Sequence, residues 1–259
     1  MRRASVILIP VLAIVMVGFA GPAAAQVRPP VRPRPQPTER IFIAVDGTYQ
    51  VGSKGFSDSE SFPSNAETAT YSGTYDVKPG PAFNIAGSGL VTRRFGVGVG
   101  VSRYSRTTPI AVTASIPHPF FFNRARSLTD TVNGTREELA VHVQARATLP
   151  MQSQRMQVAV YAGPSFFSVK QDVLTRVGFA EAYPYDSITS APGQMSNVSK
   201  SKVGFNAGAD VAYFFTRQVG VGGTAQYAGT TIQLPSAGGD DVDAKVGGFQ
   251  VGGGLRLRF

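Results

Sequence analysis

The sequence contains no cysteine, no tryptophan and only two histidines in 259 residues. Without cysteine, the chain can form no disulfide bond and cannot be acylated on a cysteine after export, as a lipoprotein is. Two histidines also leave few candidates for a catalytic base. The folded chain must therefore be stabilised by hydrogen bonds and by burial.

The first 25 residues contain the three parts of a secretory signal peptide. Arg2 and Arg3 form the charged start, an apolar stretch covers residues 6–20, and small residues occupy positions 23–25. We predict cleavage after Ala25. A retained anchor is disfavoured, because an apolar core of about 15 residues interrupted by a proline is shorter than the roughly 20 residues that span a bilayer.

Residues 26–40 are rich in proline and arginine, a composition that favours extended polyproline II. We interpret this segment as a periplasmic spacer. The alternative is that its four arginines contact an acidic envelope polymer or lipid headgroups.

Charge excludes one class of function. From Ile41 onward, 19 basic residues face 15 acidic ones. Nucleic-acid binding requires lysine and arginine clustered on one face, and this balance gives no sign of such a cluster. We therefore expect no nucleic-acid partner.

Apolar and polar residues alternate with a period of two from Ile41 onward, as they do along β-strands. Eight segments show the pattern: 41–51, 83–92, 95–102, 138–149, 156–163, 202–213, 219–230 and 249–259. The connections between them alternate in length. Short ones cover residues 92–94, 150–155 and 216–218, and long polar ones cover 52–81, 106–136, 171–200 and 234–243.

Short turns at one end and long loops at the other are typical of a bacterial outer-membrane barrel. The sequence thus predicts an all-β fold, an eight-stranded antiparallel up-and-down transmembrane β-barrel over residues 41–259. Residues 69–77 also alternate, and as a separate barrel strand they would raise the count to ten. We favour eight strands, with this segment extending the second strand beyond the membrane.

Two features indicate that the apolar faces point outward into lipid. The polar faces carry glycine beside ionisable residues, as the narrow interior of an eight-stranded barrel requires. Aromatic residues lie near strand ends and suit interfacial girdles, although tryptophan is missing: Tyr49, Phe83, Phe95, Tyr213, Tyr227 and Phe259.

The C-terminal sequence, residues 252–259, ends on phenylalanine after alternating apolar positions. It resembles the terminal assembly signal of outer-membrane barrels, with Gly254, Leu257 and Phe259 at the matching positions. The region 41–259 resembles the small outer-membrane β-barrel family that includes OmpA-type transmembrane domains, OmpX and opacity-like proteins. The resemblance implies a location in the cell outer membrane, contact with its lipid and lipopolysaccharide, and delivery to the barrel assembly machinery through the last strand.

Charged side chains on the polar faces are candidates for a network in the lumen: Asp46, Glu138, His142, Arg146, Lys202, Asp210 and Arg256. One interpretation is a hydrogen-bonded plug that stiffens the barrel. The other is a narrow, gated pore, because eight strands leave barely enough room for side chains.

Three adjacent aromatic residues, Phe120, Phe121 and Phe122, are the candidate contact surface in the second long loop. We expect them either to dip into the lipid layer or to close over the barrel mouth. Neither His118 nor His142 has a serine at a recognisable spacing, so we predict no catalytic residues. The acidic residues near position 241 form no calcium loop, and we predict no metal site and no cofactor.

These observations favour a non-enzymatic outer-membrane barrel with a structural or adhesion-like role that its long loops carry. The alternative is a narrow passive channel for small solutes. An enzyme that modifies lipid A fits the residues less well.

Overall fold

The computed structural model describes residues 40–259 except residue 53 and residues 236–240. The predicted signal peptide, its cleavage site and the spacer up to residue 39 lie outside the described residues. No helix in the described part is long and apolar enough to cross a bilayer. The secondary structure consists of β1 (Ile41–Val51), β2 (Lys54–Ser64), β3 (Glu67–Val77), β4 (Gly80–Leu90), β5 (Phe95–Pro117), β6 (Ala125–Leu149), β7 (Met156–Glu181), β8 (Ile188–Phe214), β9 (Val219–Pro235) and β10 (Asp241–Arg258).

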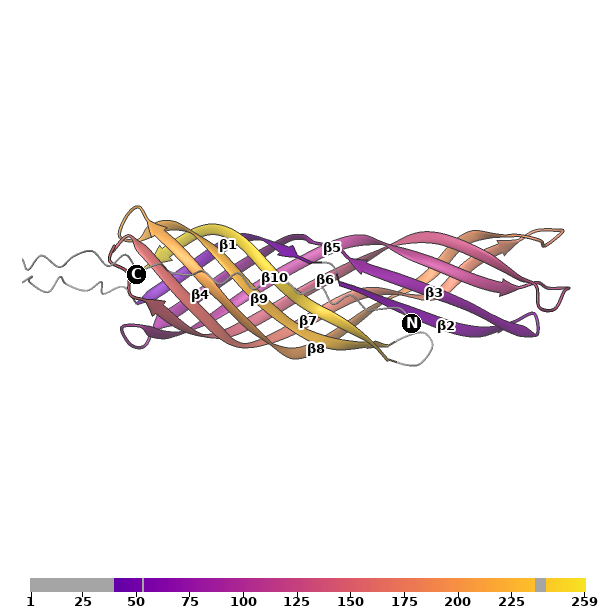
Figure 1. Ribbon diagram of the computed structural model, residues 1–259, viewed down its shortest axis with the longest axis horizontal. Helices are drawn as coiled ribbons and strands as arrows, with labels where there is room; N and C mark the ends of the chain where they lie inside the picture. The colour runs from indigo at the N-terminus through magenta and orange to yellow at the C-terminus, as the bar shows by residue number, and fades with distance from the viewer. Residues whose placement is uncertain (1–39, 53, 236–240) are drawn as a thin grey trace, which may run out of the picture. The chain divides into compact units, whose positions relative to one another are not determined.

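Eight of these strands close into a ring in the order β1-β4-β5-β6-β7-β8-β9-β10, with every pair antiparallel (Figure 1). The ring closes where β1 pairs with β10, from Phe42 opposite Arg258 to Val51 opposite Phe249. At the end of this seam the Phe259 N–H donates to the Ile41 carbonyl over 2.9 Å. The prediction of an eight-stranded antiparallel barrel is confirmed.

The two remaining strands, β2 and β3, form a hairpin outside the ring. β3 pairs with β5 from Tyr75 opposite Ile110 onward, beyond the part of β5 that pairs with β4. β3 therefore continues the line of β4 along β5, as the sequence predicted for residues 69–77. It is a strand of its own, but its partner β2 does not enter the ring, so the barrel keeps eight strands.

Strands β5 to β8 are much longer than the barrel requires, with 23 to 27 residues against 11 in β1. Residues 106–136 and 171–200, predicted as long loops, are mostly strand. The actual connections are short: residues 118–124 join β5 to β6, and residues 182–187 join β7 to β8. That prediction was wrong, because segments rich in threonine and serine also form strands where one face is buried. The exposed apolar side chains of the barrel, such as Val97 and Phe205, form what we call the lipid-facing band. We call the part of the chain beyond this band the extension: residues 54–79, 103–137, 168–202, 231–234 and 241–246.

The apolar face of the strands reverses where the extension begins. In the barrel part of β5, Val97, Val99 and Val101 are exposed on the outer face and glycines point inward. From Arg103 onward most outward residues are polar and none is a large apolar residue, whereas inward residues such as Ile110 are buried. The barrel therefore presents an apolar surface to lipid, as predicted, and the extension presents a polar surface to water.

The extension is built around an apolar core of its own, which no part of the sequence analysis anticipated. Tyr75 of β3 stacks on Phe56 of β2 at 4.4 Å between ring centroids, and its hydroxyl accepts a hydrogen bond from the Leu174 N–H of β7 over 2.9 Å. The larger side chains of this core are Phe56, Tyr71, Tyr75, Ile110, Val112, Ile116, Leu128, Phe167, Val169, Val173, Leu174, Val177, Ile188, Ile232, Leu234 and Val246.

The closing seam leads to a first prediction. A Cβ atom on Gly254 of β10 would lie 1.8 Å from the carbonyl oxygen of Val45, whereas one on Gly47 of β1 would meet nothing within 4 Å. We expect Gly254→Ala to lower the refolding yield in detergent and the temperature at which the folded gel band is lost. Gly47→Ala, the matched control in the same seam, should behave like the parent. Equal yields and temperatures for both variants would contradict the close contact.

Candidate functional site

The lumen of the barrel is polar along its length, because the inward positions of the alternating strands carry polar side chains. Small residues such as Gly96, Gly98 and Gly100 leave room for the longer ones. The buried polar side chains of the lumen include Asp46, Thr48, Gln50, Asn84, Ser102, Arg136, Glu138, His142, Gln144, Gln157, Ser165, Asn206, Asp210, Thr224, Gln226, Gln250 and Arg256.

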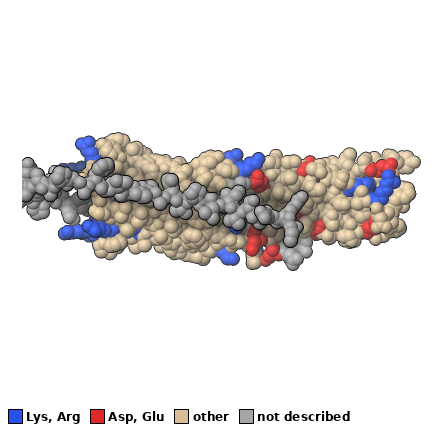
Figure 2. Space-filling model, in the orientation of Figure 1, with Lys and Arg blue, Asp and Glu red and all other residues tan. Residues whose placement is uncertain are grey.

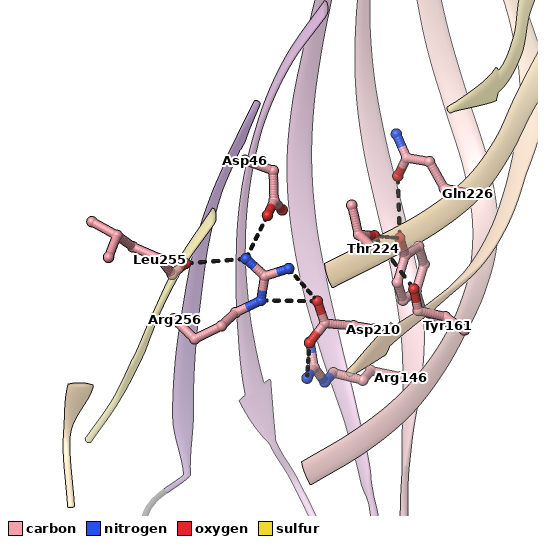
Figure 3. Close-up of polar contacts among 9 residues, drawn as sticks. Asp46, Arg146, Tyr161, Asp210, Thr224, Gln226, Leu255 and Arg256 are labelled. Atoms are coloured by element: carbon pink, nitrogen blue, oxygen red, sulfur yellow. Dashed lines mark hydrogen bonds and ion pairs between the residues drawn. The ribbon is translucent and has the colours of Figure 1, made fainter. Parts of the chain in front are cut away.

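Arg256 of β10 is the centre of an ion-pair layer (Figure 3). Its Nη1 donates to Asp46 of β1 over 2.5 Å, and its Nε and Nη2 donate to Asp210 of β8 over 2.9 and 2.6 Å. The Nη2 of Arg146 on β6 lies 3.7 Å from the other Asp210 oxygen. Two arginines and two aspartates balance in charge, and they join four strands across the lumen.

A ladder of neutral side chains lies beside this layer. The Tyr161 hydroxyl donates to the Gln226 amide oxygen over 3.2 Å and lies 2.9 Å from the Thr224 hydroxyl. The Gln226 amide donates to Gln250 over 2.9 Å, and the Gln250 amide donates to Gln50 over 3.0 Å. These hydrogen bonds give partners to polar side chains that are buried in the lumen, where an unpaired polar group would be costly.

A second ion pair closes the lumen toward the extension. Arg136 donates to Glu138 over 2.7 Å, and the other Glu138 oxygen accepts the Gly247 N–H over 2.8 Å. Arg136 also donates to the Lys245 carbonyl over 2.8 Å. The polar lumen therefore ends at a fixed charge pair, and the apolar core of the extension begins beyond it.

His142 lies between two serines, an arrangement that the sequence analysis missed. Its Nε2 is 2.9 Å from the Ser102 hydroxyl and its Nδ1 is 2.7 Å from the Ser165 hydroxyl. Asn206 donates to Ser165 over 2.8 Å. Ser165 lies directly opposite His142 in the pairing of β6 with β7. The sequence could have revealed this contact only if the strand register had been known. His142 and Ser165 are completely buried, so this group is not exposed on the lipid-facing surface.

The predicted network residues thus separate into several groups. Asp46, Arg146, Asp210 and Arg256 come together, whereas Glu138 and His142 have other partners. Lys202 is exposed and lies outside the lumen, contrary to the prediction. The alternation placed it on the inner face, but β8 pairs with β9 only from Phe205 onward, so Lys202 lies on an open edge of the strand.

A small cavity lies in the ion-pair layer. This cavity of about 10 Å³ is lined by Arg146, Asp210 and Arg256 together with the Phe42 ring, which is about the volume that a single water molecule needs. No group of three or more histidine, aspartate or glutamate side chains in the described part could hold a metal ion.

The three phenylalanines lie at the far end of the extension. Phe120, Phe121 and Phe122 are 70%, 55% and 72% exposed, in the turn that follows β5. From Arg103 to Pro117 the strand runs roughly 45 Å at about 3.3 Å per residue. The three residues therefore lie at the end of the extension, away from the barrel wall, because the segment predicted as a loop continues as strand.

A second turn completes this aromatic tip. The Phe120 ring meets the Tyr185 ring edge to face at 5.4 Å, and Tyr185 meets Tyr183 at 6.3 Å. We call Phe120, Phe121, Phe122, Tyr183 and Tyr185 the apex cluster.

Buried arginine fastens the two turns of the apex to each other. Arg126 of β6 donates to the Pro117 carbonyl over 2.7 Å and to the Tyr185 carbonyl over 3.1 Å, and it forms an ion pair with Glu181 of β7. Arg124 lies 3.6 Å from Asp186. The apex is therefore held by both hairpins, so its aromatic rings are presented on a fixed backbone.

A groove of about 560 Å³ lies on the side of the extension, between the β2–β3 hairpin and β7. Phe62, Tyr71 and Phe179 line it together with Glu60 and Arg176. Burial raises the pKa of the Tyr71 hydroxyl, and the Glu60 carboxylate that accepts its hydrogen bond raises this pKa further. The hydroxyl therefore stays protonated at physiological pH.

The ion-pair layer leads to a second prediction. Arg256→Met leaves Asp46 and Asp210 with only Arg146, so we expect a loss of about 3–5 kcal/mol of stability and a lower temperature of band loss on unboiled gels. Adding Asp46→Asn restores charge balance and should recover part of that loss. A double variant as unstable as Arg256→Met would contradict the charge argument.

The sequence matches no protein-family model and no curated protein. The solved structures similar to it include Ail of Yersinia pestis (14% identity, TM-score 0.40, covering 85% of this chain and 99% of that chain). They also include OprG of Pseudomonas aeruginosa (11%, 0.43, 85% and 96%) and Neisserial surface protein A (11%, 0.42, 85% and 97%).

Proposed function

We propose that this chain is a non-enzymatic outer-membrane barrel whose extension carries a contact surface away from the membrane. The observation that carries the proposal is the apex cluster, in which three phenylalanines are more than half exposed at the end of an otherwise polar structure. Exposed aromatic groups of this kind mark interaction sites on soluble surfaces. The partner is a molecule at the cell surface or outside the cell.

The contents of the lumen support a structural role for the barrel itself. Arg256 and its aspartates cross the lumen, and the Arg136–Glu138 pair and the apolar core follow beyond them. A network of ion pairs and hydrogen bonds of this kind stiffens a barrel. The wall then acts as a rigid base for the extension.

The position of His142 argues against catalysis. A nucleophile and base that act on lipid must lie on the lipid-facing surface or at the rim of the barrel. Ser102, Ser165 and His142 are buried inside the lumen instead, where they bond to one another. This arrangement favours a structural hydrogen-bonded group.

A narrow passive channel is the second candidate function. Five buried polar atoms in the barrel have no hydrogen-bond partner among the described residues: Thr48 Oγ1, Asn84 Oδ1, Ser88 Oγ, Arg146 Nε and Thr148 Oγ1. The first three lie on the neighbouring strands β1 and β4 and the other two on β6, and they favour water molecules bound inside the lumen.

Conductance separates these two functions. In planar bilayers we expect no steady unitary current from the refolded parent chain, because the ion-pair layer leaves a cavity of only about 10 Å³. Ala86→Leu, which adds volume beside Arg256 and Arg146, should change nothing. A steady parent current that Ala86→Leu reduces would establish the channel instead.

Attachment tests the apex cluster. We expect cells that display a variant with Phe120, Phe121 and Phe122 all changed to serine to bind protein-coated surfaces and one another several times less than parent cells. The control carries three serine substitutions at exposed threonines, Thr113, Thr129 and Thr131, and should attach like the parent. Heat-modified gel mobility checks that all three chains are folded. Attachment equal to that of cells without the chain, for parent and variants alike, would overturn the adhesive role.

A further inference from the structure

The end of the barrel that carries the short turns has charge of only one sign. Arg93 and Arg94 lie in the turn between β4 and β5, Arg155 in the turn before β7, and Arg217 in the turn before β9. The two ends of the described chain add one arginine each. We call this set the arginine rim: Arg40, Arg93, Arg94, Arg155, Arg217 and Arg258.

No aspartate or glutamate of the described chain lies at this end. Figure 2 shows lysine and arginine side chains there, whereas acidic side chains on the visible face lie over the extension. Between Ile41 and Phe259 there are 19 basic and 15 acidic residues. Setting aside the five rim arginines in this range leaves 14 basic and 15 acidic residues, so the rim accounts for the entire positive excess.

Five of the rim arginines are exposed and available to a ligand. Arg40, Arg93, Arg94, Arg155 and Arg217 form no ion pair with any described residue.

The sixth rim residue, Arg258, holds two of the turns together. Its Nε donates to the Arg217 carbonyl over 2.7 Å and its Nη1 donates to the Gln154 carbonyl over 3.2 Å. Its guanidinium lies 4.0 Å from the centre of the Phe214 ring. The positions of Arg155 and Arg217 are therefore fixed relative to each other.

The rim lies directly against the lipid-facing band. Arg94 precedes Phe95, Arg258 precedes Phe259, and Phe215 is two residues from Arg217, and these three rings are 63%, 51% and 60% exposed. Aromatic rings at a barrel end occupy the membrane–water interface. Guanidinium groups beside them lie at the depth of the headgroup phosphates, which arginine binds with paired hydrogen bonds.

The opposite boundary of the lipid-facing band differs, because its charges are mixed. Arg103 lies 3.7 Å from Glu137, and Lys170 is close in sequence to Asp172. The Arg103 cation there has an acidic partner, so it attracts anionic lipid less strongly than the rim arginines do.

We propose that the arginine rim binds the phosphates of anionic phospholipid headgroups in the membrane leaflet at the turn end, the periplasmic leaflet. The proposal rests on insertion of the barrel in the outer membrane, and it is independent of the apex cluster. The bound lipids form a ring around the turns and fix the depth of the barrel.

The test uses the chain from residue 26 onward, refolded in nanodiscs of phosphatidylcholine with about 20 mol% phosphatidylglycerol, which supplies the anionic headgroups. Native mass spectrometry measures how much phosphatidylglycerol the released protein retains relative to phosphatidylcholine. The rim variant carries Arg93→Gln, Arg94→Gln, Arg155→Gln and Arg217→Gln. The matched control removes four cations of the extension, Arg103, Arg124, Lys170 and Lys200, each changed to glutamine.

We expect the parent and the control to retain phosphatidylglycerol preferentially, and the rim variant to lose this preference by about tenfold or more. The parent preference should also weaken as salt rises. An unselective parent, or a control that loses as much as the rim variant, overturns the proposal. So does equal lipid retention by all chains combined with rim-dependent binding of soluble polyglutamate, which would assign the rim to an acidic polymer. Attachment of displaying cells, measured separately, reports on the apex alone.

Discussion

Pairing of β1 with β10 is the constraint on which the rest of the structure depends. Inside a bilayer no water is available for an unpaired backbone N–H or C=O, so a sheet can cross only if its two edges meet. The register from Phe42–Arg258 to Val51–Phe249 supplies that closure, and glycine at position 254 lets the two backbones approach. Arg256 belongs to the same seam, so the ion-pair layer forms only when the first and last strands have met.

The outer boundary of the lipid-facing band is encoded as a change in which face is apolar, without a break in the strands. On β5 the inward positions pass from Gly96–Ser102 to Ile110–Ile116 while the alternation itself continues. The same strand thus lies in two environments. In the barrel its outer face contacts lipid and its inner face is polar, and in the extension its outer face contacts water and its inner face is apolar. The barrel part buries polar groups, which lipid cannot hydrogen-bond, and the extension buries apolar groups away from water.

Alternation predicted the ring, the three short turns and the outward apolar face, because a period of two survives any uncertainty in strand ends. It could not distinguish a polar loop from a polar-faced strand, which is why residues 106–136 and 171–200 were assigned as loops. The ion-pair layer was predictable in part, since Asp46, Asp210 and Arg256 share one face. The Arg136–Glu138 pair and the serines around His142 were not, because their meeting depends on strand register, which a single sequence does not fix.

Strands β5 to β8 pass from the lipid-facing band to the apex without a turn (Figure 1). A pull on the apex is therefore carried along continuous polypeptide, and neighbouring strands resist it through ladders of hydrogen bonds that lie across the direction of force. Such bonds bear load in shear, many at a time, and do not open one after another as in a zipper. The hairpin tips thus have the mechanical coupling of a tether anchored in the membrane wall, with Arg126 joining both tips so that the two ribbons share the load.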